Sequence, residues 1–316
     1  MIPALQINGL KVSFRTESGP AAVLDDVALT LKRGQILGIV GESGCGKSTL
    51  IKTILGTLPP TARIEAGQIV FEGENLLVFS ERELNQRIRG SRIGFIPQDP
   101  LLSLNPVFKV GAQMLEIMRD HAPQGTTRRD HIARLVSLLR RLRVPDPDQA
   151  LERYPHQFSG GQRQRLLIAA ALACAPGMVI ADEPTTALDV TTQHEILLLL
   201  RELVDELDVS LLFVTHDFGV VAELCDTLCV IYAGQTVESG PVATILQAPS
   251  HPYTRALLAC HPERAASFTG IPGTVPSAIG MPPGCRFAPR CGFVEAVCAT
   301  ALPGRTGDAV RCILTP

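Results

Sequence analysis

The stretch GQILGIVGESGCGKSTLIKTILGTL, from Gly34 to Leu58, joins an apolar run, a glycine-rich turn and a segment with helical periodicity. It predicts a strand, a loop and a helix that begins at about Lys47. The central GESGCGKS, Gly41–Ser48, fits the pattern G-x-x-x-x-G-K-S. In that pattern backbone N–H groups surround phosphate oxygens, the lysine reaches the β- and γ-phosphates of a nucleotide, and the serine hydroxyl binds Mg²⁺. A chance glycine turn would not be expected between a strand and a helix.

We therefore predict a nucleotide phosphate site in this loop. The residues expected to contact the nucleotide are Gly41, Ser43, Gly44, Cys45, Gly46, Lys47, Ser48 and Thr49. Cys45 occupies a variable position of the pattern, and its side chain is interpreted only as a small one.

A second buried strand ends in two carboxylates, Asp182 and Glu183, within MVIADEPTTALD (Met178–Asp189). Ligands of open α/β sheets bind at the carboxyl ends of strands. Asp182 is expected to hold Mg²⁺ through water. Glu183 is expected to orient the attacking water as general base, because phosphoryl transfer depends mainly on positioning and charge stabilisation. Alone, such a pair would more often be a solvated strand end, but beside a phosphate loop it predicts hydrolysis.

The segment FSGGQRQR, Phe158–Arg165, places Ser159 where a helix N-cap belongs, before two glycines and a long apolar helix. A helix N-terminus with free backbone N–H groups is a second anion site. An ordinary capped helix would have the same pattern. With two anion sites for one nucleotide, it is open how the second site would reach the phosphates, because one loop already surrounds them from one side.

Composition limits the classes of protein that remain. The 316 residues allow one large domain, alone or with a small one. With 29 basic and 31 acidic residues there is no general positive charge to hold nucleic acid. The first residues lack an export signal, and no apolar run reaches the length of a membrane span. Nine cysteines without such a signal point to a reducing compartment.

The pattern changes several times along the chain. Short β-rich runs from Leu5 to about Phe71 predict an antiparallel layer, and residues between about 82 and 174 are mostly helical in pattern. The apolar runs GMVIADE and SLLFVTHD, each followed by a helix, predict a parallel sheet. From Pro249 onward Pro, Gly and Cys become dense, which predicts a small appended domain.

With these motifs in order, the sequence resembles the ATP-binding subunits of ABC transporters over nearly its whole length. The resemblance implies an α/β fold, an ABC-type P-loop ATPase cassette over 1–248, with a parallel-sheet core, an antiparallel β-subdomain and a helical subdomain at about 90–175. A small Cys-containing C-terminal domain would follow over 249–316. In that family ATP lies between two cassettes. The γ-phosphate held by one chain would therefore be contacted by the other chain's Ser159, Gly160, Gly161 and Gln162.

The same resemblance implies roles for four further residues. Gln98 in IPQDP is similar to the Q-loop residue that senses Mg²⁺ and the attacking water, and Asp189 matches the loop that crosses the dimer seam. His216 in LLFVTHD resembles the switch histidine that contacts the γ-phosphate. Phe14 in VSF resembles the aromatic residue that stacks on adenine, where Tyr is commoner. The implied Mg²⁺ site comprises Ser48, Gln98 and Asp182.

Longer segments resemble one subfamily, the dipeptide and oligopeptide importer ATPases, a group that also serves nickel and other small solutes; they are QDPLLSLNP, YPHQFSGGQRQR, ADEPTTALDV and SHPYTRALLAC. This implies a second ABC ATPase subunit, in most such systems a paralogous chain, two permease subunits and an extracytoplasmic solute-binding protein. The chain would be peripheral, at the cytoplasmic face of the inner membrane. Nickel or another small solute stays open as cargo. A soluble ABC ATPase acting on ribosomes or DNA is disfavoured by the single phosphate loop and the absence of a long heptad run.

Four cysteines near the end of the chain, Cys285, Cys291, Cys298 and Cys312, are spaced C-x5-C-x6-C-x13-C. A small domain with few apolar runs needs a disulfide or metal cross-link to keep its fold. In a reducing compartment a metal site suits this purpose better than disulfides. Zinc sites favour closer pairs of cysteines, but Zn²⁺ stays open beside an iron-sulfur cluster. The resemblance favours a 4Fe-4S cluster, whose negative charge could be offset by Arg286, Arg290 and Arg311. The remaining cysteines are interpreted as packing residues: Cys45, Cys174, Cys225, Cys229 and Cys260.

Overall fold

The computed structural model describes residues 2–122, 125–186, 188–260, 270–281, 283–300 and 310–313. Ala187 and parts of the tail predicted at 249–316 (261–269, 282, 301–309 and 314–316) lie outside the described residues. The chain forms two compact units, one from residues 1–78 and 214–316 and one from 79–213. We describe each unit by itself.

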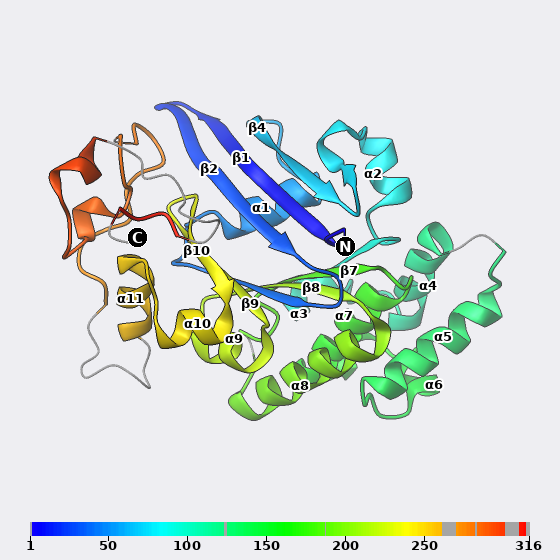
Figure 1. Cartoon of the computed structure of the whole chain (residues 1–316). Coiled ribbons are helices and arrows are strands. Elements are labelled where there is room, and N and C mark those ends of the chain that lie inside the picture. The colour runs from blue at the N-terminus through cyan, green and yellow to red at the C-terminus, as the bar shows by residue number, and fades with distance from the viewer. Residues whose placement is uncertain are drawn as a thin grey trace. The chain divides into compact units, whose positions relative to one another are not determined.

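The first unit contains the antiparallel layer that the β-rich runs predict (Figure 1). Its strand order is β2-β1-β4-β5, with β1 (Leu5–Thr16) paired antiparallel to both β2 (Gly19–Leu31) and β4 (Ala62–Phe71), and β5 (Glu74–Asn75) at the edge. The register shifts between Asn8 and Lys11 in the β1–β4 pair. There Gly67 lies so close to β1 that an added Cβ would stand 2.5 Å from the Cα of Leu10, so this bulge requires glycine.

A second sheet layer of the first unit has the order β10-β9-β3. All five residues of β3 (Ile36–Val40) are buried, as expected of a parallel strand covered on both faces, and β3 runs parallel to β9 (Thr227–Tyr232). β10 (Gln235–Pro241) pairs antiparallel to β9. The helices of this unit are α1 (Lys47–Ile54), α9 (Phe218–Leu224), α10 (Val242–Gln247) and α11 (Pro252–Ala259), with short 3-10 turns η1 (Leu76–Val78), η3 (Ala288–Arg290) and η4 (Ala296–Ala299).

The second unit is mainly helical around three strands in the order β8-β7-β6. β6 (Ile93–Ile96) and β7 (Met178–Asp182) are parallel, and β8 (Ser210–Thr215) leads the chain back to the first unit. The helices are α2 (Glu81–Arg87), α3 (Pro100–Ser103), α4 (Val110–His121), α5 (Arg128–Arg141), α6 (Pro147–Ala150), the 3-10 turn η2 (Pro155–Gln157), α7 (Gly160–Leu172) and α8 (Val190–Leu207).

The segment predicted as helical contains one strand. Helices α4, α5 and α7 fall where the periodicity places them, but IGFI, Ile93–Ile96, forms β6 because its backbone pairs with β7. At Gly94 an added Cβ would stand 2.3 Å from the carbonyl oxygen of Ala171, so helix α7 packs directly on this strand.

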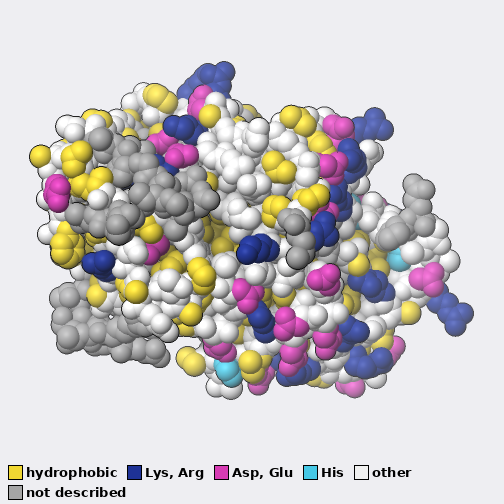
Figure 2. All heavy atoms as spheres, viewed as in Figure 1, with side chains coloured by type: hydrophobic (Ala, Val, Ile, Leu, Met, Phe, Trp, Pro, Cys, Tyr) yellow, Lys and Arg dark blue, Asp and Glu magenta, His cyan; other side chains and the backbone are white. Residues whose placement is uncertain are grey.

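Charges of both signs are interspersed on the helices of the second unit (Figure 2). Arg141 at the end of α5 pairs with Glu206 of α8, and Arg143, two residues after α5, pairs with Glu202 of α8. Such exposed pairs contribute little to stability. Among the described residues, no helix combines the length and the apolar character needed to cross a membrane.

Candidate functional site

The predicted nucleotide residues divide between the two units. The first unit carries the phosphate loop, Phe14 and His216; the second carries Gln98, the carboxylates after β7 and the SGGQ segment. The role of each residue in binding or hydrolysis stays a prediction.

The phosphate loop is folded around the amine of Lys47. Lys47 Nζ donates to the carbonyl oxygens of Gly41 at 2.7 Å and Glu42 at 3.2 Å, and its side chain is buried. Gly41 packs so tightly that an added Cβ would stand 2.2 Å from the carbonyl oxygen of Ile231, and Gly46 has φ +106°. Only glycine satisfies both positions. The loop thus presents a cation at its centre, while Ser43, Gly44 and Ser48 are exposed.

The loop also rests on the turn between β9 and β10. Gly234 N–H donates to the carbonyl oxygen of Cys45 at 2.9 Å. The Cys45 side chain is buried, and this burial raises the pKa of its thiol, which keeps it neutral. Cys45 is therefore a packing residue of the loop, as its variable position suggests. Cys174, Cys225 and Cys229 are buried too, and Cys260 is partly exposed.

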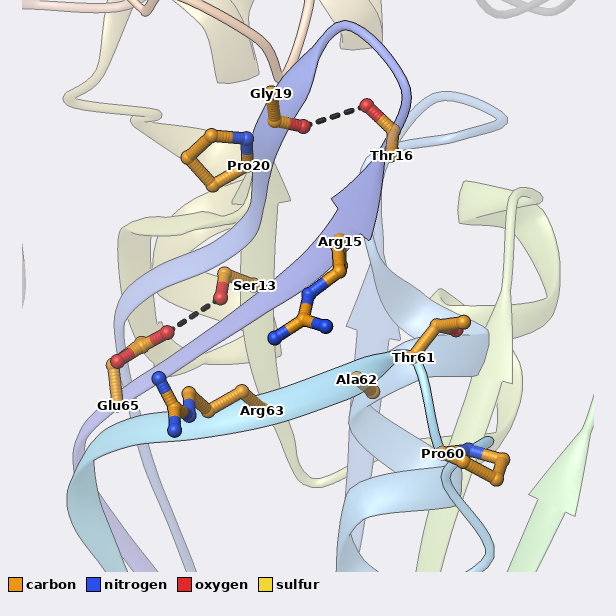
Figure 3. Close-up of a pocket in the computed structure, with 10 residues that line it drawn as sticks. All are labelled: Ser13, Arg15, Thr16, Gly19, Pro20, Pro60, Thr61, Ala62, Arg63 and Glu65. Carbon is orange, nitrogen blue, oxygen red and sulfur yellow. Dashed lines mark hydrogen bonds between the residues drawn. The ribbon is translucent and has the colours of Figure 1, made fainter.

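Phe14 lies on β1 between two residues that line an open pocket of about 540 Å³ (Figure 3). In this pocket Ser13 donates to Glu65 at 2.6 Å, and Arg15 and Arg63 contribute the basic side chains. Side chains alternate along a strand, so Phe14 faces the other side of β1 from Ser13 and Arg15. The pocket therefore lies on the other face of β1 from the Phe14 side chain.

His216 follows directly after β8. The strand residues Ser210–Thr215 are buried, and His216 is exposed at their carboxyl end. The next residue, Asp217, caps α9 by accepting the N–H of Gly219 at 2.7 Å. Strand end and helix cap together fix the backbone on both sides of the histidine.

Gln98 and Glu183 come together in the second unit. Asp182 ends β7, and Glu183 has φ +45°, which is unusual for a residue other than glycine and typical of functional sites. Glu183 Oε2 accepts hydrogen bonds from Gln98 Nε2 at 3.4 Å and from the Thr186 hydroxyl at 3.2 Å. The carboxylate predicted as general base is thus held by donors on two segments. Thr186 was not predicted, because a threonine after a strand carries no distinctive signal.

Ser159 caps α7 as its position predicts. Its hydroxyl accepts the N–H of Gln162 at 3.3 Å, and Gln162 Oε1 accepts the N–H of Ser159 at 3.0 Å, which forms a capping box. An added Cβ on Gly161 would stand 2.6 Å from Thr192 Cγ2. Thr192 in turn donates from its N–H to Asp189, the cap of α8, at 3.0 Å. The SGGQ segment and the Asp189 loop are therefore one packed assembly.

The four tail cysteines line a single small cavity. Cys285, Cys291, Cys298 and Cys312 surround it together with His251 and Phe287. Burial, with the smaller effect of neighbouring thiols, raises the pKa of Cys285 and Cys291. A Cys₄ donor set on loops fits an iron-sulfur cluster in chemistry. Among the described residues, however, no group of three or more His, Cys, Asp or Glu side chains is arranged to hold a metal ion, so the structure does not support the predicted cluster.

The three arginines next to these cysteines pair with carboxylates elsewhere. Arg286 contacts Asp25 at 2.7 Å and Arg311 contacts Asp26, both on β2. Arg290 pairs with Glu42. The expectation that these arginines neutralise a cluster is replaced by this pairing, since their charges are already met. Sequence reasoning missed Glu42, because it occupies a variable position of the phosphate-loop pattern.

The comparisons with known proteins agree with this arrangement. A family model described as "ABC transporter" matches residues 24–186, and one described as "Oligopeptide/dipeptide transporter, C-terminal region" matches 237–298. The dipeptide transport ATP-binding protein DppD of Bacillus subtilis is 43% identical over 97% of this chain and 92% of its own length. The oligopeptide transport ATP-binding protein OppD of Salmonella typhimurium is 42% identical over 95% and 89%.

Solved structures give the same assignment of fold. The ATP-binding cassette MJ0796, solved as a dimer bound to ADP and Pi, has a TM-score of 0.66 and is 25% identical, covering 75% of this chain and 98% of its own. The chain therefore belongs to the ABC transporter family, as an ATP-binding subunit with the oligopeptide/dipeptide transporter C-terminal region.

Proposed function

We propose that this chain is the ATP-binding and ATP-hydrolysing subunit of an ABC importer for dipeptides or oligopeptides. The observation that carries the proposal is the phosphate loop, in which the buried Lys47 amine bonds the carbonyl oxygens of Gly41 and Glu42. The relatives DppD and OppD, named for dipeptide and oligopeptide transport, support the choice of cargo.

The reaction follows from the residues on each unit. Bound phosphates would replace the carbonyl oxygens as partners of Lys47, and the exposed Ser48 hydroxyl would join Gln98 and Asp182 around Mg²⁺. Glu183, oriented by two donors, would align the attacking water. His216 would contact the γ-phosphate and Phe14 would stack on adenine. Mg²⁺ would supply charge neutralisation to the phosphates.

A dimer of cassettes completes this site in the proposal. Ser159 and Gly160 are exposed at the N-terminus of α7, where backbone N–H groups favour an anion. Because the phosphate loop already supplies one set of donors, we assign this second set to the nucleotide of a partner cassette, in most such importers a paralogous chain. Asp189 would lie at the seam between the two.

Two membrane permease subunits are the further partners that we propose. The residues after Gln98 expose four large apolar side chains, which are Leu101, Leu102, Val107 and Phe108. Exposed apolar side chains so close together in the sequence fit contact with another protein. The chain would then be peripheral, at the cytoplasmic face of the inner membrane, with a solute-binding protein on the other side delivering the cargo.

The four cysteines around the tail cavity are proposed to hold a 4Fe-4S cluster, with Zn²⁺ as the alternative. The shared cavity supports four ligands from one lobe. The raised pKa of Cys285 and Cys291 means that ligation would release protons.

The test of this function is uptake by the whole complex. The chain would be produced with its permeases, partner ATPase and binding protein in proteoliposomes, and supplied with labelled dipeptides, oligopeptides and nickel chelates. ATP-dependent uptake of peptides supports the proposal. If only nickel chelates are taken up, the assigned substrate is nickel and not peptides. Co-purification with ribosomes or DNA instead of permeases would overturn the transport function itself.

A further inference from the structure

An ion pair between a buried arginine and a partly buried glutamate joins the tail to the phosphate loop. Arg290 Nη1 and Nη2 donate to the two carboxylate oxygens of Glu42 at 2.7 and 3.1 Å. The Arg290 side chain is only 3% exposed. Its guanidinium also donates to the carbonyl oxygens of Ile271 and Pro272 at 3.0 and 2.9 Å. An arginine with this many partners has one defined position.

Glu42 transmits that position to the loop through its backbone. Its N–H donates to the hydroxyl of Tyr253 at 3.0 Å, and its carbonyl oxygen accepts from Lys47 at 3.2 Å. Tyr253 is completely buried, with its ring 4.5 Å from that of Tyr232 and 5.4 Å from that of Phe287. Glu42 is therefore held by the tail through its side chain and through its N–H, while its carbonyl oxygen accepts from Lys47.

A second contact reaches the other half of the loop. Arg286 donates to Asp25 at 2.7 Å and to the carbonyl oxygen of Ala233. The next residue, Gly234, donates its N–H to the carbonyl oxygen of Cys45. One short tail segment, Cys285–Cys291, thus holds the phosphate loop at Glu42 directly and at Cys45 through the β9–β10 turn.

We propose that Arg290 is a positioning residue for the nucleotide site: through Glu42 it holds the backbone carbonyl that fixes the Lys47 amine in place before phosphate binds. Without the guanidinium, the partly buried Glu42 carboxylate loses its counter-charge and turns toward solvent or toward the Lys47 amine. Either movement misplaces the cation that meets the phosphates. The inference rests on the proposed function, because it requires that this loop binds the nucleotide.

The test measures the affinity of the purified full-length chain for a fluorescent ATP analogue with Mg²⁺. Arg290→Gln and Glu42→Gln are each expected to weaken binding about tenfold, the value of one charge-assisted hydrogen bond. Arg290→Lys restores part of the affinity, because it returns the charge without the bidentate geometry. The double variant Arg290→Gln/Glu42→Gln is no weaker than either single variant, because the pair acts as a unit.

The matched control is Arg311→Gln. Arg311 is another buried tail arginine, 4% exposed, that pairs with Asp26 and donates to the carbonyl oxygen of Thr236, and neither of these partners belongs to the phosphate loop. It should change nucleotide affinity less than about twofold, although it lowers the melting temperature. In the assembled importer, Arg290→Gln raises the KM for ATP while kcat stays nearly constant, a split that a general loss of fold would not produce.

The variant Lys47→Ala distinguishes a failure of the positioning role from a failure of the proposed nucleotide site. If Lys47→Ala weakens binding and neither Arg290→Gln nor Glu42→Gln does, the positioning role is wrong and the nucleotide site stands. Equal losses in Arg290→Gln and Arg311→Gln also overturn the positioning role. If Lys47→Ala leaves binding unchanged, the proposed nucleotide site fails and the inference fails with it.

Discussion

Gln98 donates a hydrogen bond from Nε2 to Oε2 of Glu183, at 3.4 Å. The bond joins Gln98, two residues after β6, to the residue directly after β7, at the carboxyl ends of two parallel strands. A change in the position of Gln98 therefore acts on the carboxylate that we expect to align the attacking water. The same glutamine lies three residues before Leu101, the first of the exposed apolar residues that we propose to contact the permeases.

Glu183→Gln is expected to preserve ATP binding and to lower turnover by at least about a hundredfold, because an amide cannot act as a base. The amide oxygen can still accept from Gln98 and Thr186, so the local fold is kept. Phosphate release by the reconstituted complex measures the effect, and nucleotide affinity is the control. Hydrolysis near the normal rate would remove Glu183 from this role.

Lys47→Ala should fail at the earlier step of binding. The loss removes the cation and also the bonds that close the loop over Gly41 and Glu42. Equilibrium titration with the fluorescent ATP analogue should show weaker binding, in contrast to Glu183→Gln. Equal affinity for the two variants would contradict the assignment.

The isolated chain should hydrolyse ATP slowly. The capped SGGQ helix is expected to serve a nucleotide held by another cassette, so turnover should rise with the fraction of dimer. Light scattering and phosphate release on one dilution series would check this dependence. A demonstrably monomeric sample that works at the rate of the full complex would exclude the composite site.

Gly161→Ala should destabilise the second unit, because the new methyl would press on Thr192 Cγ2 at 2.6 Å. The expected loss is about 1–3 kcal/mol of unfolding free energy. Thr192→Ser removes that methyl and keeps the hydroxyl bond to Asp189, so the double variant should recover stability. Denaturant unfolding measures both. No recovery in the double variant would show that the close approach is not the cause.

Anaerobically purified protein should be brown and contain about four irons per chain. Single serine variants of Cys285, Cys291, Cys298 and Cys312 should lose iron, whereas Cys174→Ser should keep it, because Cys174 lies in the other unit. Metal analysis and the visible spectrum give the result. A colourless preparation with one zinc per chain would contradict the assignment of iron but keep the four cysteines as metal ligands. The absence of any metal would contradict both assignments.

Local pattern was enough for much of this fold. The apolar run, glycines and periodicity around Lys47 predicted β3, the loop and α1, and Ser159 predicted the cap of α7. The strand β6 was not predicted, because four apolar residues in a helical context carry no period of their own and become a strand only by pairing with β7.

The contacts between the tail and the cassette could not be predicted from sequence pattern, for a different reason. Arg290 and Glu42 are 248 residues apart, and each belongs to a segment whose visible signal concerns something else, the cysteines in one case and the phosphate loop in the other. The pair owes its geometry to burial. For two residues so far apart in the sequence, burial depends on the assembled fold and not on local pattern.

The three tail arginines also limit how freely this protein can be recombined. Asp25, Asp26 and Glu42 supply carboxylates to Arg286, Arg311 and Arg290, so the end of the chain and its beginning form a matched set. A chimera in which another tail replaces the last 68 residues, 249–316, keeps Asp25, Asp26 and Glu42 but loses Arg286, Arg311 and Arg290. Transplanting the tail is therefore an exchange of two distant segments, because positions 25, 26 and 42 have to match the tail that they receive.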